Sequence, residues 1–181
     1  MILFFIRLIF TYKLLILIIL EKNNYKTFRQ ILMVKLNYSH ILQCDERKFW
    51  EDLTNFVELQ KYLSRQIQKI EILEENNDVT ILNIIIFVRS LIKKEFLVQI
   101  KILKKSKNEL FLEILNGFTK GTQCTISTSV DKDQSICQVN TDIKFSLKTM
   151  ILIPIIKREY EGILRKFFRD MEAKIKESEK V

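Results

Sequence analysis

The chain has 181 residues, 48% of them hydrophobic and 29% charged, which suits one globular domain with room for a terminal segment. Three glycines and one proline exclude collagen-like and most low-complexity proteins, and three scattered cysteines exclude a disulfide scaffold or a zinc ribbon. The net charge of +8 divides equally between residues 1–32 and residues 33–181. The longer part is therefore only mildly basic, and no nucleic-acid partner is expected.

Residues 1–32 have two interpretations. Within Ile2–Leu20, 15 of 19 residues are Ile, Leu or Phe, which is apolar enough for a membrane anchor in spite of Lys13. The basic residues after it would keep the rest of the chain on the cytoplasmic side. Alternatively, the start is over-extended and the protein begins near Met33, where regular strand alternation sets in. In both cases we expect residues 33–181 to be the working, cytoplasmic domain.

The first part of this domain predicts a strand followed by two short helices. Met33–Cys44 alternates with period two, which places Leu36, Tyr38, His40, Leu42 and Cys44 on one face of the strand. Asp45 stands where a helix N-cap belongs, and apolar residues at spacings of three and four predict a helix over 46–56. A second short helix is expected around Val57–Leu63.

Six strands joined by short turns are predicted next. Their expected ranges are Gln66–Leu73, Val79–Leu91, Lys94–Lys105, Leu110–Leu115, Thr122–Val130 and Ile136–Leu147. Turn residues occupy 74–78, 106–108, 116–122 and 131–135. Because the connections are short, the strands should form an antiparallel meander. Cys124 and Cys137 fall on successive strands, where they could be cross-strand neighbours engaged in ordinary packing.

A long helix is predicted at the C-terminus. Pro154 fits its first turn, where a missing N–H costs nothing. Apolar residues then recur every three or four positions and form one stripe, made of Ile156, Tyr160, Ile163, Phe167, Met171 and Ile175. A stripe of this length needs an apolar surface to cover it. The concave face of the meander is the large surface available.

This order of elements resembles the SRPBCC or START-like helix-grip superfamily, nearest to its polyketide cyclase/dehydrase and coenzyme Q-binding branch. Three stretches carry the resemblance: HILQCDERKFWEDLTNFVELQKYL at 40–63, NGFTKGT at 116–122, and PIIKREYEGILRKFFRDMEAKIKE at 154–177. The family usually has Ala-Pro where this chain has Cys44-Asp45. Cysteine is small enough for the alanine position, so the departure changes how the helix is capped rather than the packing.

The resemblance implies an α+β fold in which a curved antiparallel sheet of about seven strands grips the long helix around an apolar cavity. Members of the superfamily bind lipids, sterols, quinones or polyketides; some catalyse cyclisation or hydrolysis, and many only bind or carry. Fifteen residues are expected to line the cavity: Tyr38, His40, Phe96, Val98, Ile100, Leu112, Ile114, Cys137, Val139, Thr141, Ile143, Ile156, Tyr160, Ile163 and Phe167. The competing interpretation is that these side chains simply fill a core.

The candidate chemistry is sparse. His40, the sole histidine, either contacts a polar group of a ligand or acts as an acid or base, or it is satisfied by a protein neighbour. No metal-ligand pattern is present, and no cofactor is expected. The sequence therefore favours non-enzymatic binding or carriage of a hydrophobic small molecule, such as a lipid, quinone or polyketide-like compound. A cyclase or dehydratase that uses His40 or Tyr38 is the alternative.

Overall fold

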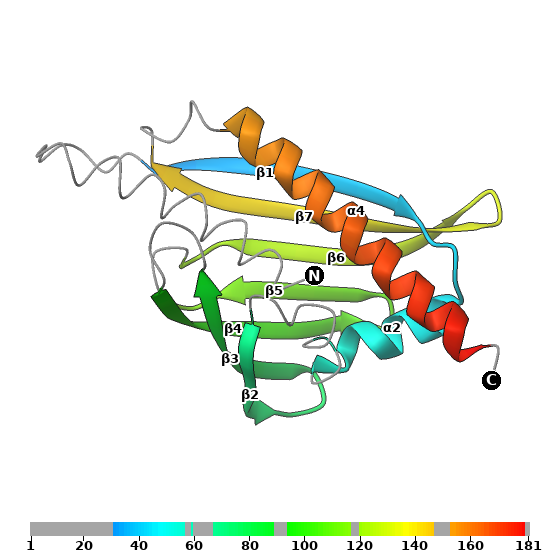
Figure 1. Ribbon diagram of the computed structural model, residues 1–181, viewed down its shortest axis with the longest axis horizontal. Coiled ribbons are helices and arrows are strands. Elements are labelled where there is room, and N and C mark those ends of the chain that lie inside the picture. The colour runs from blue at the N-terminus through cyan, green and yellow to red at the C-terminus, as the bar shows by residue number, and fades with distance from the viewer. Residues whose placement is uncertain are drawn as a thin grey trace, which may run out of the picture.

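Seven antiparallel strands form one curved sheet, and a long helix crosses one of its faces (Figure 1). This computed structural model describes residues 31–56, 59, 67–88, 94–116, 120–146 and 153–179. The elements are β1 (Ile31–Ile41), α2 (Glu46–Thr54), β2 (Ile67–Glu75), β3 (Val79–Val88), β4 (Lys94–Ser106), β5 (Glu109–Ile114), β6 (Gln123–Asp131), β7 (Gln134–Ser146) and α4 (Ile153–Ser178).

The strand order β1-β7-β6-β5-β4-β3-β2 confirms the predicted meander of six strands, with β1 added at the β7 edge. The turns explain the tight connections. Between β6 and β7, Lys132 and Asp133 have φ values of 47° and 64°, the left-handed backbone that suits a two-residue hairpin turn. Gly121, in the bend before β6, has φ of 80°, which favours glycine. The bend expected at 116–122 includes residues 117–119, which lie outside the described residues.

Burial alternates along the strands and separates an apolar inner face from a more polar outer face. On β5, for example, Leu110, Leu112 and Ile114 are buried, while the residues between them are partly exposed. The buried strand residues form one core with apolar residues of α2 and α4. The period-two pattern in the sequence is therefore the direct cause of the sheet's two-sided character.

Both elements at the start of the domain end earlier than predicted. β1 ends at Ile41 rather than Cys44: the Leu42 N–H makes a last bond to the Ser135 carbonyl of β7, and the chain then turns into α2. α2 ends at Thr54, two residues short of the predicted end. Asp45 is its N-cap, accepting from the Lys48 N–H at 2.9 Å. The second short helix, expected around Val57–Leu63, lies largely outside the described residues.

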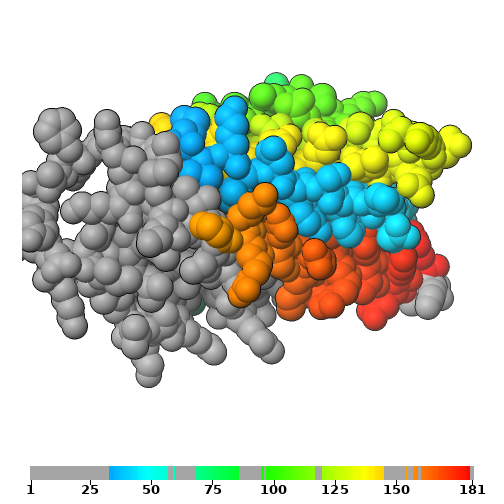
Figure 2. Space-filling model, turned by 90° about the horizontal axis from the view of Figure 1, so that it is seen from above, coloured from blue at the N-terminus to red at the C-terminus, as the bar shows by residue number. Residues whose placement is uncertain are grey.

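α4 lies along β1 and reaches α2 with its C-terminal end (Figure 2). Pro154 occupies the first turn, as predicted. An ion pair of 3.3 Å between Lys48 and Glu179 joins α2 to the last turn of α4. Among the described residues, no helix is long and apolar enough to cross a membrane. The segment Ile2–Leu20, in which an anchor was expected, lies outside the described residues.

Candidate ligand-binding site

The side of the sheet that faces α4 is lined by buried, mostly apolar side chains. Of the fifteen residues predicted to line a cavity, ten are buried: Val98, Ile100, Leu112, Ile114, Cys137, Val139, Thr141, Ile143, Tyr160 and Phe167. Tyr38, His40 and Ile163 are partly buried, and the side chains of Phe96 and Ile156 lie outside the described part of the structure. The ten buried residues are at most 5% exposed, so the interior is closed in this conformation. Their role in ligand contact stays a prediction.

Three buried residues of α4 were missed by the sequence analysis. Leu164, Phe168 and Glu172 follow one another at spacings of four and form a second inward row beside the predicted stripe. Two aromatic residues in succession, Phe167 and Phe168, were the available signal that the apolar face is wider than one stripe. Glu172 is the notable member, because carboxylates are rarely buried without a specific partner.

Glu172 has two partners at the end of β1. Its Oε1 atom lies 2.9 Å from His40 Nε2 and accepts the backbone N–H of Gln43 at 2.8 Å. The side chains of His40 and Glu172 are only 19% and 10% exposed. The carboxylate therefore holds the imidazole in a fixed orientation through Nε2. The second ring nitrogen, Nδ1, is not part of this contact. This arrangement suits either a clamp between β1 and α4 or an acid–base pair.

Aromatic rings surround this pair. The ring of Phe168 stacks on His40 at 4.6 Å between centroids, on Tyr38 at 5.8 Å and on Phe49 at 5.9 Å. Burial raises the pKa of the Tyr38 phenol, and the guanidinium of Arg165 partly offsets this effect. Tyr38 is therefore protonated at neutral pH and able to donate a hydrogen bond. The structure thus brings together the two residues, Tyr38 and His40, that the sequence offered as candidates for chemistry.

Two buried hydroxyl groups of the interior form a hydrogen bond with each other. The Tyr160 phenol and the Thr141 hydroxyl lie 3.1 Å apart, joining the middle of β7 to the first half of α4. Burial raises the pKa of Tyr160 far above its usual range, so the phenol stays neutral. The two hydroxyls satisfy each other, which explains how polar groups are tolerated at these buried positions.

A different hydroxyl, that of Thr122, is buried and has no hydrogen-bond partner within the described part of the chain. Thr122 is 2% exposed and its carbonyl accepts the N–H of Ile114. The residue precedes Gln123, which pairs with Asp142, so Ile143 is its cross-strand neighbour. These two neighbours of Thr122, Ile114 and Ile143, are both apolar. The orphaned hydroxyl therefore costs stability, by about 1–3 kcal/mol for a group of this kind.

Replacing Thr122 by valine should stabilise the protein by about 1 kcal/mol, because valine keeps the shape and removes the unpaired hydroxyl. Thr141→Val is the matched control, since it removes a hydroxyl that is bonded to Tyr160. The control should lose about 1 kcal/mol. Urea unfolding of the two variants and the unaltered chain measures both effects. Equal destabilisation by the two variants would show that Thr122 does have a partner.

The three cysteines are free thiols. The predicted neighbour relation between Cys124 and Cys137 is wrong: Cys124 is opposite Thr141 and Cys137 is opposite Thr128, so the two lie four positions apart along the hairpin. Burial raises the pKa of Cys124 to about 12 and that of Cys44 to about 11. Among the described residues, no three His, Cys, Asp or Glu side chains gather in a way that could hold a metal ion.

Cys44 should react slowly with iodoacetamide in the folded protein. Its pKa is raised from 9.0 to about 11, so the thiolate fraction at pH 8 is roughly 100-fold below that of an ordinary thiol. Alkylation followed by mass spectrometry should therefore show a rate that rises about tenfold per pH unit up to about pH 11. The urea-unfolded chain is the control and should react as N-acetylcysteine does. An equally fast reaction in the folded state would contradict the burial of Cys44.

No family model matches the sequence, and no curated protein matches it either. Solved structures do resemble it. The Zhui aromatase/cyclase from Streptomyces has a TM-score of 0.62 and 11% identity, covering 80% of this chain and 96% of that one. A START superfamily protein from Mycobacterium smegmatis has a TM-score of 0.58 and 14% identity, covering 80% and 97%. Norcoclaurine synthase from Thalictrum flavum, in complex with dopamine and hydroxybenzaldehyde, has a TM-score of 0.60 and 14% identity, covering 80% and 88%.

These likenesses rest on shape, since the identities are far below those of close relatives. The matches cover 80% of this chain and 88–97% of each of the three structures. They agree with the element order β1, α2, six-stranded meander and α4. The chain therefore has the START-like helix-grip fold, a curved antiparallel sheet around a C-terminal helix, as the sequence resemblance implied.

Proposed function

We propose that this chain binds or carries a hydrophobic small molecule between the inner face of the sheet and α4. The inner face supplies a broad apolar surface, which includes Val98, Ile100, Leu112, Val139 and Ile143. Burying apolar surface is the main source of affinity for a hydrophobic ligand. The structurally similar norcoclaurine synthase, which holds two small aromatic compounds, supports a small-molecule ligand.

The unpaired hydroxyl of Thr122 is the observation that carries this proposal. A buried polar group without a partner is rare in folded proteins and is often explained by a missing ligand or water. A carbonyl or hydroxyl group of a ligand would satisfy it at the start of β6, beside the apolar inner face. Because the interior is closed, entry requires side chains of the inner face to repack or α4 to separate from the sheet. We expect binding to be slow and to stabilise the protein.

Native mass spectrometry of the full chain, followed by organic extraction, tests the proposal. A co-purifying mass in the lipid or quinone range is the expected result. The same measurement on Thr122→Val should show less bound ligand if the ligand carries a polar group at this position. A ligand-free mass that does not change when a panel of lipids and quinones is added would mean that the sheet and helix enclose a filled core.

The His40–Glu172 pair favours a second function, catalysis of the cyclase or dehydratase type. The pair has the geometry of an imidazole oriented by a carboxylate, and Tyr38 is a neighbouring proton donor. His40→Ala separates the two functions. A carrier should keep most of its affinity, whereas an enzyme should lose turnover and keep its substrate affinity. Turnover would be assayed with the compound identified by extraction.

We also propose that residues 33–181 form the ligand-binding domain and that residues 1–32 decide whether it is held at a membrane. An anchored domain would meet a lipid or quinone directly in the bilayer, which suits the hydrophobic ligand proposed above. Fractionation of cells that express the full chain tests this point. If the protein is recovered with the membranes and is not released by carbonate extraction, the segment is an anchor. Recovery without membranes indicates that the segment has no anchoring role.

A further inference from the structure

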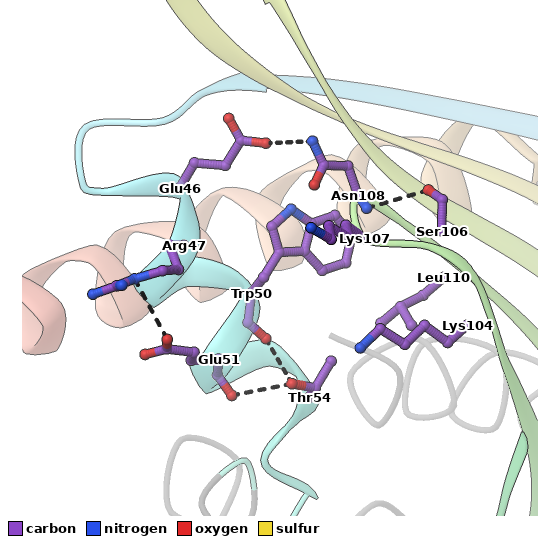
Figure 3. A pocket seen from close by; sticks show the side chains of 10 residues that line it. All are labelled: Glu46, Arg47, Trp50, Glu51, Thr54, Lys104, Ser106, Lys107, Asn108 and Leu110. Atoms are coloured by element: carbon purple, nitrogen blue, oxygen red, sulfur yellow. Dashed lines mark hydrogen bonds and ion pairs between the residues drawn. The ribbon is translucent and has the colours of Figure 1, made fainter. Parts of the chain in front are cut away.

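A surface hollow of about 420 Å³ lies between α2 and the hairpin of β4 and β5 (Figure 3). We call it the α2 pocket. It is lined by Glu46, Arg47, Trp50, Glu51, Thr54, Lys104, Ser106, Lys107, Asn108 and Leu110. None of these ten residues belongs to the set predicted to line the interior. The volume falls in the range of small-molecule sites. The α2 pocket is therefore a separate candidate binding site.

The apolar wall of the α2 pocket is held in place. Trp50 Nε1 donates to the Thr128 hydroxyl at 3.0 Å, which fixes the plane of the indole ring. Phe49 packs edge-on against the same ring, at 5.8 Å between centroids. Leu110 continues the apolar surface on the side of the hairpin. Trp50 is 8% exposed and Leu110 2%, so only a rigid edge of this wall faces the hollow. Such an edge favours a ligand with a flat apolar body, because no side chain must be ordered on binding.

The carboxylates at the α2 pocket already have partners. Glu46 accepts hydrogen bonds from Thr128, Asn108 and Ser135, which ties α2 to three turns and strands of the sheet. Glu51 forms an ion pair of 3.6 Å with Arg47, one turn away on the same helix. The charge of Glu51 is thus offset by Arg47, whereas Glu46 is bound by neutral donors and keeps its negative charge in the pocket lining.

The two lysines of the pocket, Lys104 and Lys107, differ from these carboxylates in their partners. No ion pair joins Lys104 or Lys107 to a carboxylate anywhere in the described ranges of the chain. Their neighbour Lys105, by contrast, pairs with Glu109 at 3.3 Å and lies over the ring of Phe111. Figure 3 shows Lys104 extending from the hairpin toward Thr54 of α2. Three of the lining residues are basic (Arg47, Lys104 and Lys107) and two are acidic (Glu46 and Glu51), so the pocket combines a fixed aromatic edge with a net charge of +1.

We propose that the α2 pocket binds a small organic anion with a flat apolar body, such as an aryl carboxylate. The ring lies against the exposed edge of Trp50, and the carboxylate is held by the ammonium groups of Lys104 and Lys107. This site does not depend on the interior ligand proposed above.

A neighbouring hollow limits the class of ligand further. It has a volume of about 210 Å³ and shares Thr54, Lys104 and Leu110 with the α2 pocket. Its far side is lined by Glu75 and Asp78. Two carboxylates at that end repel a second anionic group. The ligand is therefore a monoanion: its one carboxylate lies at Lys104 and Lys107, and no second anionic group extends toward Glu75 and Asp78.

Trp50 provides the readout, because it is the single tryptophan of the chain. Dansylglycine is the probe: it has a naphthalene body, carries one carboxylate, and accepts energy from tryptophan. Dansylamide has the same ring without the carboxylate and is the matched neutral probe. Titration of the full chain should show quenching of Trp50 emission by both probes. We expect dansylglycine to bind about fivefold more tightly, since the interaction with two exposed ammonium groups is modest. Equal affinities at low salt would overturn the charge assignment.

Variants then locate the site. Lys104→Gln with Lys107→Gln should weaken dansylglycine binding about fivefold, to the affinity of dansylamide, and leave dansylamide unchanged. Lys105→Gln, which removes the same charge from a residue outside the pocket, should change neither. A weakening of dansylglycine in Lys105→Gln that equals that of Lys107→Gln would mean a general charge effect and would refute the pocket. Each lysine is also replaced singly, so that misfolding of the double variant leaves two measurable proteins.

A second measurement places the probe at the indole itself. The signal of the Trp50 indole N–H in a proton–nitrogen NMR spectrum should shift when dansylglycine is added. It should stay unchanged when inorganic phosphate is added. A shift with phosphate alone would show that charge suffices without an aromatic body. No shift with either compound at millimolar concentration would place the dansyl group elsewhere and would overturn the proposal.

Discussion

Replacing Phe168 by alanine is expected to destabilise the protein by about 3–5 kcal/mol, the usual cost of a fully buried phenylalanine. The side chain is 0% exposed and its ring contacts His40, Tyr38, Phe49 and Phe167. Its removal leaves a cavity where β1, α2 and α4 meet. Chemical unfolding in urea, fitted with a common m-value, measures the loss of stability.

Phe111→Ala is the matched control for this prediction. Phe111 lies on β5 and is partly exposed, so the ring has solvent on one side. Its loss should cost roughly 1 kcal/mol from reduced apolar burial and from the lost contact with Lys105. A similar cost for both variants would mean that the junction of β1, α2 and α4 contributes no more to the fold than an outer-face contact does.

Replacing Glu172 by alanine is expected to cost about 3 kcal/mol, because two largely buried groups lose their hydrogen-bond acceptor. The change leaves the His40 imidazole and the Gln43 N–H without their acceptor. Both groups are largely shielded from water, which cannot fully replace the lost bonds. Urea unfolding near neutral pH provides the measurement. Glu172→Gln should recover part of the loss, because the amide oxygen can still accept from Gln43.

Glu179→Ala provides the comparison on the same helix. Glu179 also joins α4 to the start of the domain, through Lys48 at 3.3 Å, but both side chains are 37% exposed. Exposed pairs of this kind contribute about 0.2–1 kcal/mol. The expected ratio between the two variants is thus at least threefold. If Glu179→Ala cost as much as Glu172→Ala, burial would not be the reason for the strength of the His40–Glu172 contact.

The pattern of apolar residues predicted most of the architecture. The alternation in Met33–Cys44 and the six later runs bounded by turn residues identified each strand of the described sheet, and the spacing of Tyr160, Phe167 and Met171 identified the long helix. These predictions succeed because each is local: a period of two or 3.6 residues records which side of an element is buried. The resemblance to START-like proteins rested on the order of these elements, and the structure has that order.

The polar details could not be predicted in the same way. Glu172 lies 132 positions from His40 in the sequence, and no local pattern records that contact. The cysteine relation failed for a related reason: the hairpin register depends on the turn at Lys132 and Asp133, and a shift of a few positions changes every cross-strand neighbour. The α2 pocket was also absent from the sequence analysis, since its walls come from a helix and a hairpin about 55 residues apart.

The amino-acid sequence by itself determined the elements, their order and the buried face of each, because backbone periodicity couples directly to burial. It also determined that the inner face is apolar and that few residues, among them the single histidine, are candidates for a catalytic role. Only the tertiary structure decided which polar groups meet. It joined His40 to Glu172 and Tyr160 to Thr141, and it left the Thr122 hydroxyl unpaired among described residues. These outcomes depend on strand register and on the placement of α4, and both are set by packing between distant segments.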